Sequence, residues 1–366
     1  MLRTIARMTS EGSAAKRLKM SSPTIGTHNG HFHADEALAV YLLRQLPTFT
    51  ASTLIRTRDP ALLETCTIVV DVGGEYDPTK HRYDHHQRSF NETFPGHNTK
   101  LSSAGLVFLH FGKELLAITL KVSQADEKVG ILWEKLYKDF IEAIDANDNG
   151  ISVYDSAALS AANIEKRFHD SGLSIASLVG DLNPSWNDPP PPSNQPPQGY
   201  EDTHFELASI LIGEAFMRKL MYYASAWLPA RDVVHAAYAE RKTYDSRGRI
   251  LVFKQPVPWK DHLYTLEESS PPPSPDNSLV LYVLYPETKP SEAVPHPKWR
   301  IQAVPESPSS FASRKALPEA WRGVRDEKLD EVAGVQGGVF VHASGFIGGN
   351  KTWEGVRRMA EKAVEM

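Results

Sequence analysis

Histidine and aspartate side chains are concentrated in three short segments of this 366-residue chain. The segments are Thr27–Glu36, Val70–Gly74 and Tyr83–Arg88, which read THNGHFHADE, VDVGG and YDHHQR. Imidazole and carboxylate ligands without thiolate suit Mn²⁺, Zn²⁺ or Fe²⁺, and Mg²⁺ where oxygen ligands dominate. Two such cations held ~3.5–4 Å apart clamp a phosphoryl group and lower the pKa of a bridging water. The three segments therefore indicate a metal site suited to hydrolysis.

The spacing inside these segments suits two neighbouring ions. His33 and Asp35 are two residues apart in a loop that enters a helix, so they can diverge toward different ions, and Asp71 at the end of a buried strand can bridge them. Each segment alone has a plainer explanation, because a strand-end aspartate often only caps the next turn. A lone histidine such as His110 or His235 is usually a surface residue. Joined in order by glycine-rich turns, the segments are hard to attribute to packing.

Short apolar strands alternate with helices between Pro23 and about Asn149. We expect strands at Ile25–His28, Thr53–Arg56 and Ile68–Val72, and helices at Ala34–Leu46, Ala104–Phe111 and Asp126–Asn147. Ser102 and Ser103 can cap the second of these helices. This alternation predicts a mostly parallel sheet with ligands at the carboxyl ends of its strands, which is where the histidines and aspartates fall.

Prolines interrupt this pattern in the segment 184–197, which is typical of a surface linker or an inserted loop. Beyond it we expect helices at Phe205–Ala226, Ala230–Lys242 and Lys351–Val364, and strands at Ile250–Phe253, Leu279–Tyr285, Trp299–Val304 and Val339–His342. The predicted fold class is α/β, with a mostly parallel metal-binding domain over residues 23–183. A proline-rich linker or loop over 184–200 would precede a helical connector and a smaller α+β substrate domain over 201–366.

The composition is that of an ordinary soluble globular chain, with 41% hydrophobic and 23% charged residues. A formal net charge of −5 argues against a long basic duplex-binding surface. No apolar run approaches the ~20 residues of a membrane-spanning helix, so we expect no membrane partner. The one cysteine, Cys66, has no second cysteine to pair with and is expected to be a small core residue.

The first 22 residues differ from the rest and are expected to be a disordered targeting tail. Residues 1–10 contain two arginines and no acid, so they can form a basic amphipathic helix like that of a mitochondrial presequence. The cluster Lys16–Lys19 can serve as a nuclear signal. A tail without any signal is the alternative, and the choice of organelle is open.

Longer strings around these segments carry a family resemblance. The strings are GTHNG from Gly26, FHADEALA from Phe32, VDVGGEYD from Val70, HRYDHHQRSF from His81, LSSAG from Leu101, WLPAR from Trp227, WRIQ from Trp299, WRG from Trp321 and FVHASGFIGG from Phe340. The chain resembles the DHH phosphoesterase superfamily and, more closely, its MYG (melanocyte proliferating gene) exonuclease family. The resemblance extends over nearly everything from Pro23 onward and implies a DHH-type N-terminal domain.

The resemblance also implies roles for the residues of the three segments. One ion would be held by His28, His33 and Asp71 with a further acid, either Asp145 or Asp148. We favour Asp148, because Asp-Asn-Gly stands where the superfamily tends to have Asp-Thr-Gly. The other ion would be held by Asp35, Asp71 and His85.

Two residues of the triplet would act beside the ions. Asp84 would orient a neighbouring histidine, and His86 would contact the scissile phosphate or protonate the leaving oxygen. One departure concerns His33, since the superfamily usually has aspartate there. A neutral ligand in place of an anionic one changes the metal preference.

The implied substrate contacts lie largely in the second domain. Its glycine-rich loop would be His342–Gly349, with the contacts made by His342, Ser344, Gly345, Gly348 and Gly349. An ordinary strand-to-helix turn is the alternative for this loop. Candidate phosphate clamps are Arg56, Arg58, Arg88 and Arg300, although any single arginine is more often only a surface charge.

The function implied by the resemblance is a 3′-to-5′ exoribonuclease that cuts single-stranded RNA through a water activated by two divalent cations. Mn²⁺ is favoured over Mg²⁺, and the expected location is the mitochondrion and nucleus, with the cytoplasm as a further site. One alternative is a hydrolase of small phosphoanhydrides or cyclic dinucleotides with the same metal core. Another is a non-catalytic RNA-binding regulator whose metals are structural. Oligomeric state is left open.

Overall fold

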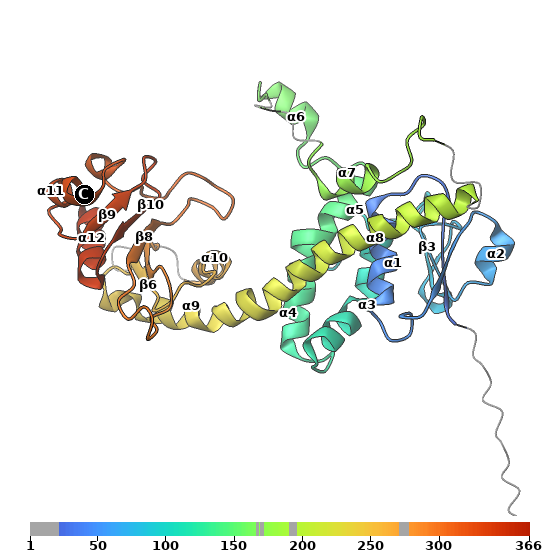
Figure 1. The fold of residues 1–366 in the computed structure, drawn as a ribbon, viewed down its shortest axis with the longest axis horizontal. Coiled ribbons are helices and arrows are strands. Elements are labelled where there is room, and N and C mark those ends of the chain that lie inside the picture. The colour runs from blue at the N-terminus through green and yellow to red at the C-terminus, as the bar shows by residue number, and fades with distance from the viewer. Residues whose placement is uncertain (1–21, 166–167, 169–171, 190–195, 271–277) are drawn as a thin grey trace, which may run out of the picture. The chain divides into compact units, whose positions relative to one another are not determined.

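The computed structural model describes residues 22–165, 168, 172–189, 196–270 and 278–366 (Figure 1). The expected tail lies outside this set except for its last residue, as does the centre of the proline-rich segment. The chain forms two compact units, Met1–Arg218 and Lys219–Met366. Each unit contains a five-stranded sheet with helices packed on it, so the expected α/β class is confirmed.

The sheet of the first unit is mostly parallel, as expected. Its strands are β1 (Thr24–Thr27), β2 (Thr53–Arg56), β3 (Ile68–Val70), β4 (Tyr76–Asp77) and β5 (Arg82–Tyr83). They lie in the order β2-β1-β3-β5-β4, and β4 is antiparallel to β5 whereas the other neighbours are parallel. Since β1 and β3 are adjacent and parallel, their carboxyl ends bring the first two metal-binding segments to one edge of the sheet.

Helices cover both faces of this sheet. The described helices of this unit before α8 are α1 (Ala34–Arg44), α2 (Pro60–Glu64), α3 (Ser103–Leu120), α4 (Glu127–Leu136), α5 (Glu142–Asp148), α6 (Ser156–Ala161) and α7 (Ile175–Gly180), with a 3₁₀ turn at Pro78–Lys80, and α6 has no buried residue. α1 and α3 pack against each other. On the opposite face, α2 contributes Leu63 to a small core with Cys66 and Val69. A Cβ on Gly26 would come within 2.9 Å of the Cys66 sulfur, so this buried cysteine packs against a glycine.

Two helices differ from their expected extent. α3 begins at Ser103 but continues nine residues beyond the expected Phe111, to Leu120. By length and composition alone α3 is able to cross a membrane, but more than half of it is buried inside the unit, as in a core helix that contacts neighbours on several sides. The helix expected over Asp126–Asn147 is interrupted by a π-helical turn at Tyr137–Ile141 between α4 and α5.

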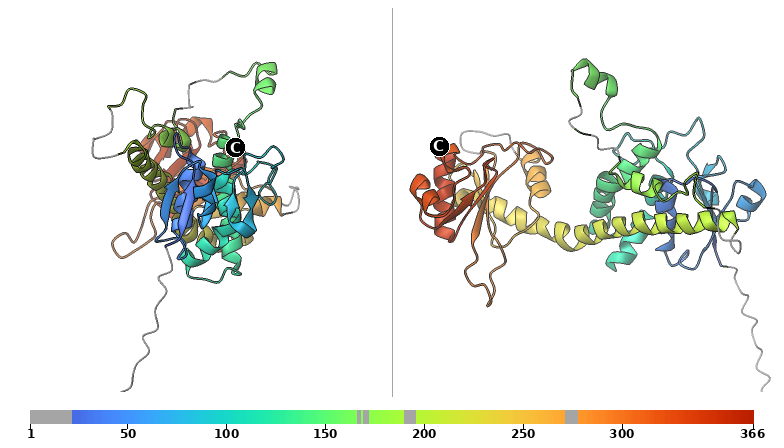
Figure 2. Two further views of the ribbon diagram at one scale, coloured as in Figure 1. Left: turned by 90° about the vertical axis from the view of Figure 1, so that its right-hand side faces the viewer. Right: turned by 45° about the horizontal axis from the view of Figure 1, so that its top comes forward.

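The boundary between the two units lies inside α8 (Pro197–Tyr222) and not in the proline-rich segment where we expected it. The first part of α8 packs on α1, beside which it runs in Figures 1 and 2. The Ser209 hydroxyl donates to the Ala37 carbonyl at 2.8 Å, and Gly213 lies against the Tyr41 ring with no room for a Cβ. These contacts make the start of α8 part of the first unit.

The second unit is an α+β arrangement. Its strands are β6 (Ile250–Val252), β7 (Tyr282–Pro286), β8 (Trp299–Ala303), β9 (Gly338–Val341) and β10 (Ile347–Asn350), in the order β6-β7-β8-β10-β9. Its helices are the π-helical turn η3 (Tyr223–Trp227), α9 (Leu228–Glu240), α10 (Lys260–Glu268), α11 (Asp326–Ala333) and α12 (Trp353–Glu365), with 3₁₀ turns at Arg241–Thr243 and Glu319–Trp321. α11 and α12 pack on one face of the sheet, and α9 and α10 pack on the other.

Candidate metal centre

A cavity of about 490 Å³ in the first unit gathers the residues of the three segments. Its lining residues are His28, His33, Ala34, Asp35, Arg58, Asp71, His85, His86, Lys100, Ile144, Asn147, Asp148 and Asn149. They come from the ends of β1 and β3, the segments after β2 and β5, the segment before α3, the start of α1 and the end of α5. Segments separated by as many as 120 residues in sequence thus meet at one edge of the sheet.

Asp71 lies at the centre of this cluster, directly after β3. Its backbone adopts a left-handed conformation with φ of 58°, which only a few residue types other than glycine tolerate. One carboxylate oxygen lies 3.2 Å from His28 Nε2 and the other lies 3.1 Å from His85 Nε2. Burial alone would raise the pKa of Asp71, but the hydrogen bonds from His28 and His85 outweigh burial and hold this pKa at about 2. Asp71 is therefore an anion that faces two imidazoles at once.

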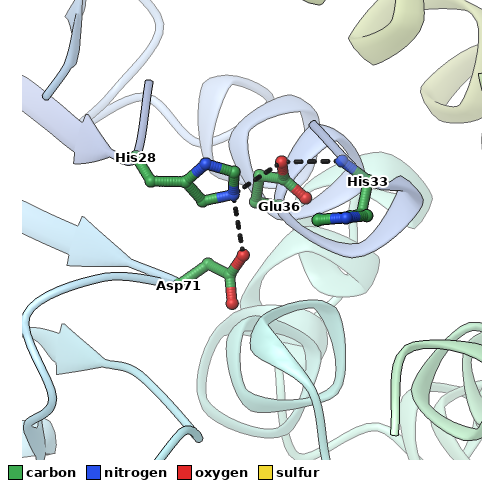
Figure 3. A group of neighbouring side chains, drawn as sticks. All are labelled: His28, His33, Glu36 and Asp71. Atoms are coloured by element: carbon green, nitrogen blue, oxygen red, sulfur yellow. Dashed lines mark hydrogen bonds and ion pairs between the residues drawn. The ribbon is translucent and has the colours of Figure 1, made fainter. Parts of the chain in front are cut away.

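Glu36 joins His28 to the start of α1 (Figure 3). Its Oε1 lies 3.0 Å from His28 Nε2 and accepts a 2.8 Å hydrogen bond from the backbone N–H of His33. Burial lowers the pKa of His28, but the carboxylates of Asp71 and Glu36 outweigh burial and raise this pKa to about 10. Sequence reasoning gave Glu36 no role beyond the helix dipole. Its signal was present, because a glutamate three residues after a helix cap commonly reaches back to the cap N–H.

His85 contacts Asp148, one of the two acids between which the sequence left the choice open. His85 Nε2 lies 3.1 Å from Asp148 Oδ2, at the end of α5. Asp148 thus contacts His85, and its carboxylate also lies within 4.8 Å of ligand atoms of His33 and Asp35. Burial lowers the pKa of His85, and the hydrogen bonds to Asp148 and Asp71 more than reverse this and raise it to about 9.

Asp145 does not line the cavity. Its Oδ1 accepts hydrogen bonds from the backbone N–H of Ser102 and of Gly105, both at 3.0 Å, and from the Ser102 hydroxyl at 2.7 Å. Its Oδ2 accepts from the Tyr137 hydroxyl at 3.1 Å. Asp145 thus caps the N-terminus of α3 from another helix, and its expected role as a metal ligand is corrected. The Ser102 side chain consequently donates to Asp145 instead of capping α3 itself.

Asp35 is completely buried, and only one of its two carboxylate oxygens is hydrogen-bonded by a described residue. Its Oδ2 accepts a 2.7 Å hydrogen bond from the Ser103 hydroxyl, whereas its Oδ1 has no hydrogen-bond partner among the described residues. Burial, followed by repulsion from the carboxylates of Asp71, Glu36 and Asp148, raises the pKa of Asp35 well above its usual range. So many acids in one buried place require positive charge, which protons on the histidines or bound cations can supply.

Asp84 holds His86 at the mouth of the cavity. Its Oδ1 lies 2.6 Å from His86 Nδ1, and its Oδ2 accepts a 2.5 Å hydrogen bond from the Gly74 N–H. The hydrogen bond that His86 donates to the Asp84 carboxylate raises the pKa of His86. Asp84 is buried, whereas the His86 side chain is 62% exposed and lies 3.8 Å from Asp71. This geometry suits the role expected of Asp84, which is to orient a neighbouring histidine.

The donor atoms of the cavity fit divalent cations. Three groups of ligand atoms each lie within 4.8 Å of one another: His28, His33, Glu36 and Asp71; Asp71, His85 and His86; and His33, Asp35 and Asp148. Two of these acids also carry buried oxygens that no described residue hydrogen-bonds, Asp35 Oδ1 and Glu36 Oε2. Buried oxygens of this kind are costly without a partner, and a bound cation can serve as that partner. All the expected metal ligands except Asp145 lie in this cavity.

Cationic side chains line the cavity only in part as expected. Arg58 and Lys100 line it, and Lys100 carried no signal in the sequence. Arg88 is exposed and does not line it. Arg56 is buried and donates to the Gly30 carbonyl at 2.6 Å, so it supports the loop between β1 and α1. Arg300, in the second unit, pairs with Glu287.

The expected glycine-rich loop over His342–Gly349 is wrong in its second half. Gly348 and Gly349 belong to β10, which pairs with both β8 and β9, so their backbone groups are used in the sheet. A Cβ on Gly348 would lie 3.0 Å from the Phe340 carbonyl oxygen, which explains the glycine by close packing. The turn that remains carries Ser344, whose N–H donates to His342 Nδ1 at 3.2 Å, and Gly345 with φ of 74°. His342 and Ser344 are exposed.

The assignment of Asp148 and Asp145 is tested by a matched pair of variants. We expect Asp148→Asn to weaken Mn²⁺ binding at least about tenfold, because it removes a charge that faces the cavity. Asp145→Asn should leave Mn²⁺ binding within twofold, since an amide oxygen can still accept from Ser102 and Gly105. Isothermal titration of the metal-free protein measures both. The reverse order of effects would overturn the assignment.

Fold and site together define an α/β protein of two units with a histidine-and-carboxylate centre for divalent cations. A family model described as "Uncharacterised protein family (UPF0160)", the MYG1 exonuclease model, matches residues 24–364. The chain is 48% identical to the MYG1 exonuclease of Homo sapiens over 354 residues, which cover 94% of this chain and 86% of that protein. It is 44% identical to a MYG1 protein of Schizosaccharomyces pombe over 343 residues, 93% and 97% of the two chains. The chain therefore belongs to the MYG1 exonuclease family, as its sequence strings indicated.

Among solved structures, a match is found to exonuclease RecJ bound to manganese. The alignment covers 94% of this chain and 91% of that chain, with 12% sequence identity and a TM-score of 0.25.

Proposed function

We propose that this protein is an exonuclease that depends on divalent cations and removes nucleotides from the 3′ end of single-stranded RNA. The observation that carries the proposal is the cavity in which carboxylates and imidazoles converge beside Arg58 and Lys100. Ligands for cations next to fixed positive charges suit a phosphate, because both can neutralise its oxygens. Relatives that share most of the chain are named exonucleases, which favours a polynucleotide over a small anhydride.

The residues of the cavity favour direct hydrolysis by water. None of the described residues that line it is serine, threonine or cysteine, so no hydroxyl or thiol stands ready to form a covalent intermediate. Bound cations would polarise the phosphate and lower the pKa of the attacking water. Asp35, Asp71, Asp148, His28, His33 and His85 would hold them. His86, fixed by Asp84, is placed to donate a proton to the leaving oxygen.

The donor set also bears on the metal. Three histidines among the proposed ligands, His28, His33 and His85, favour Mn²⁺ over Mg²⁺, because Mg²⁺ binds oxygen ligands almost exclusively. Asp71 would be a ligand common to two cations, because it faces both His28 and His85. The mitochondrion and nucleus are proposed as locations on the basic composition of residues 1–19 alone, which lie outside the described residues.

The proposal is tested by incubating the purified protein with Mn²⁺ or Mg²⁺ on RNA and DNA strands labelled at either end. We expect 5′-labelled RNA to shorten stepwise with Mn²⁺, 3′-labelled RNA to release labelled mononucleotide at once, and DNA to be cut more slowly. Internal cleavage, digestion from the 5′ end, or equal rates with EDTA would contradict the proposal. Turnover of dinucleotides but not of a twenty-mer would favour the small-substrate alternative.

Asp84 offers a test of how His86 acts. We expect Asp84→Asn to lower kcat about 10²-fold, which is a common contribution for a positioned proton donor, because the amide no longer fixes the charged imidazole. KM and Mn²⁺ affinity should change less than threefold, because the side chain that loses its partner is His86, which is not one of the six residues proposed to hold the cations. Steady-state kinetics with a short RNA measure the effect. Loss of the metal together with activity would show instead that Asp84 supports the ligand shell.

A further inference from the structure

A second cavity, of about 630 Å³, lies entirely within the second unit and serves no step described above. It is formed by the end of α8, the π-helical turn η3, the segment before α10, the first turn of α10 and strands β7 and β8. Its aromatic lining consists of Tyr222, Tyr223, Trp227, Trp259 and Tyr285. So many rings around one cavity indicate a planar or apolar ligand.

Two of these rings, Tyr223 and Trp227, belong to the π-helical turn, and Tyr222 directly precedes it. The turn brings Trp227 close to Tyr223, with 5.6 Å between the ring centroids, and the Tyr222 ring lies 5.6 Å from the Tyr223 ring. The Trp227 indole N–H donates to Asp261 Oδ2 at 3.1 Å, which fixes the orientation of the ring. Tyr223 is buried, whereas Tyr222 is 48% exposed. Single π-helical turns are rare in proteins, and those that occur are often found at functional sites. A ring of fixed orientation beside an exposed ring suits a platform on which a planar ligand stacks.

Two polar side chains in this cavity are available to a ligand. The Tyr285 hydroxyl donates to Gln302 Oε1 at 2.9 Å, so the Gln302 amide is held in place. Its Nε2 group donates to none of the residues that the structure describes. Lys260 is exposed at the start of α10, and no ion pair joins it to a described residue. The cavity thus combines ring faces with an oriented amide donor and a positive charge.

We propose that this cavity binds a nucleobase of a single-stranded nucleic acid. The base would stack on Tyr222 and Trp227, its ring acceptors would face the Gln302 amide, and Lys260 would face an adjoining phosphate. Base stacking on aromatic side chains, with nearby cations for the backbone, is how many proteins hold single strands. The inference rests on the proposed function and deepens it, because it assigns the second unit a strand-holding site. A proline-rich peptide is the rival occupant, but it offers Lys260 no phosphate.

Binding is measured apart from cleavage by titrating the full chain, in EDTA, into a fluorescein-labelled U12 RNA and following anisotropy. We expect Tyr222→Ala to raise Kd about tenfold or more, and Tyr222→Phe to stay within twofold because the ring remains. Lys260→Ala should raise Kd and reduce its salt dependence. Phe311→Ala is the matched control, since Phe311 is a fully exposed ring elsewhere in the same unit, and it should change nothing.

The result that overturns the inference is U12 binding that is absent in the natural chain or unchanged by Tyr222→Ala. Tyr222-dependent binding of a peptide with the sequence of residues 184–197, without an effect of Tyr222→Ala on RNA, would overturn it in favour of the rival. Mn²⁺-dependent hydrolysis of bis(p-nitrophenyl) phosphate by the natural chain tests the metal centre separately, because this substrate is too small to span a strand site. If no phosphodiester is cut although U12 binding depends on Tyr222, the proposed function fails and the nucleobase site stands.

Discussion

Replacing Asp71 by asparagine is expected to abolish metal-dependent activity, with a fall of ~10³-fold or more in kcat/KM. Among the described residues, Asp71 is the one carboxylate in contact with both His28 and His85, so its charge serves both sides of the cluster. The amide retains the size of the side chain. Asparagine also tolerates the left-handed backbone at this position, where φ is 58°, so the fold should persist while Mn²⁺ binding is lost.

The matched control for this variant is Asp59→Asn. Asp59 is an exposed acid that caps α2 by accepting from the Ala61 N–H at 2.9 Å, and asparagine caps a helix equally well. It makes the same chemical change away from the cavity, so activity and Mn²⁺ binding should remain at the level of the natural chain. Circular dichroism checks the fold of both variants. A folded Asp71→Asn variant that keeps its Mn²⁺ and its nuclease activity would contradict the proposed metal centre.

The second large effect concerns stability, because Asp145 caps α3 while buried. Burial raises its pKa from the usual value of 3.8 to about 7, although four hydrogen bonds oppose this. A carboxyl whose pKa is higher in the folded chain stabilises the fold fully below its unfolded pKa, and this contribution is lost as pH rises through the folded pKa. Between pH 5 and pH 8 the loss should be roughly 2–3 kcal/mol of the free energy of unfolding.

Asp145→Asn has no carboxyl group to titrate at this position. The variant should therefore not lose, between pH 5 and pH 8, the part of the free energy of unfolding that the natural chain loses through Asp145. The measurement is urea unfolding of the metal-free natural chain and of the variant at several pH values between 5 and 8. Other titrating groups change both proteins alike, so the difference between the two curves isolates Asp145. We expect that difference to grow in favour of the variant as pH rises to about 7 and then to level off. A difference independent of pH would show that Asp145 is already ionised at pH 5.

The position of the metal centre could be predicted because its residues follow strands. His28 and Asp71 come immediately after β1 and β3, and adjacent parallel strands end at the same edge. The apolar runs that form those strands are continuous in the sequence. The sequence therefore indicated both where the strands end and which residues there can bind a metal. The family resemblance added the expected role of each of these residues.

The remaining features depended on contacts that the sequence does not encode locally. Asp145 and Asp148 stand one helical turn apart, and what separates them is that Asp145 accepts from Ser102, 43 residues earlier. Lys100 lines the cavity only because of how the segment before α3 lies. β10 was missed because Gly348 and Gly349 resemble a loop, whereas close packing against Phe340 requires glycines in a strand.

The most direct test of the central claim is anomalous diffraction from a crystal soaked in Mn²⁺, recorded at the manganese absorption edge. We predict two peaks in the cavity of the first unit, both within coordinating distance of the Asp71 carboxylate, one beside His28 and the other beside His85. Anomalous peaks found only elsewhere on the chain would contradict the proposed metal centre. So would the absence of any peak, with Asp71 still hydrogen-bonded to His28 and His85.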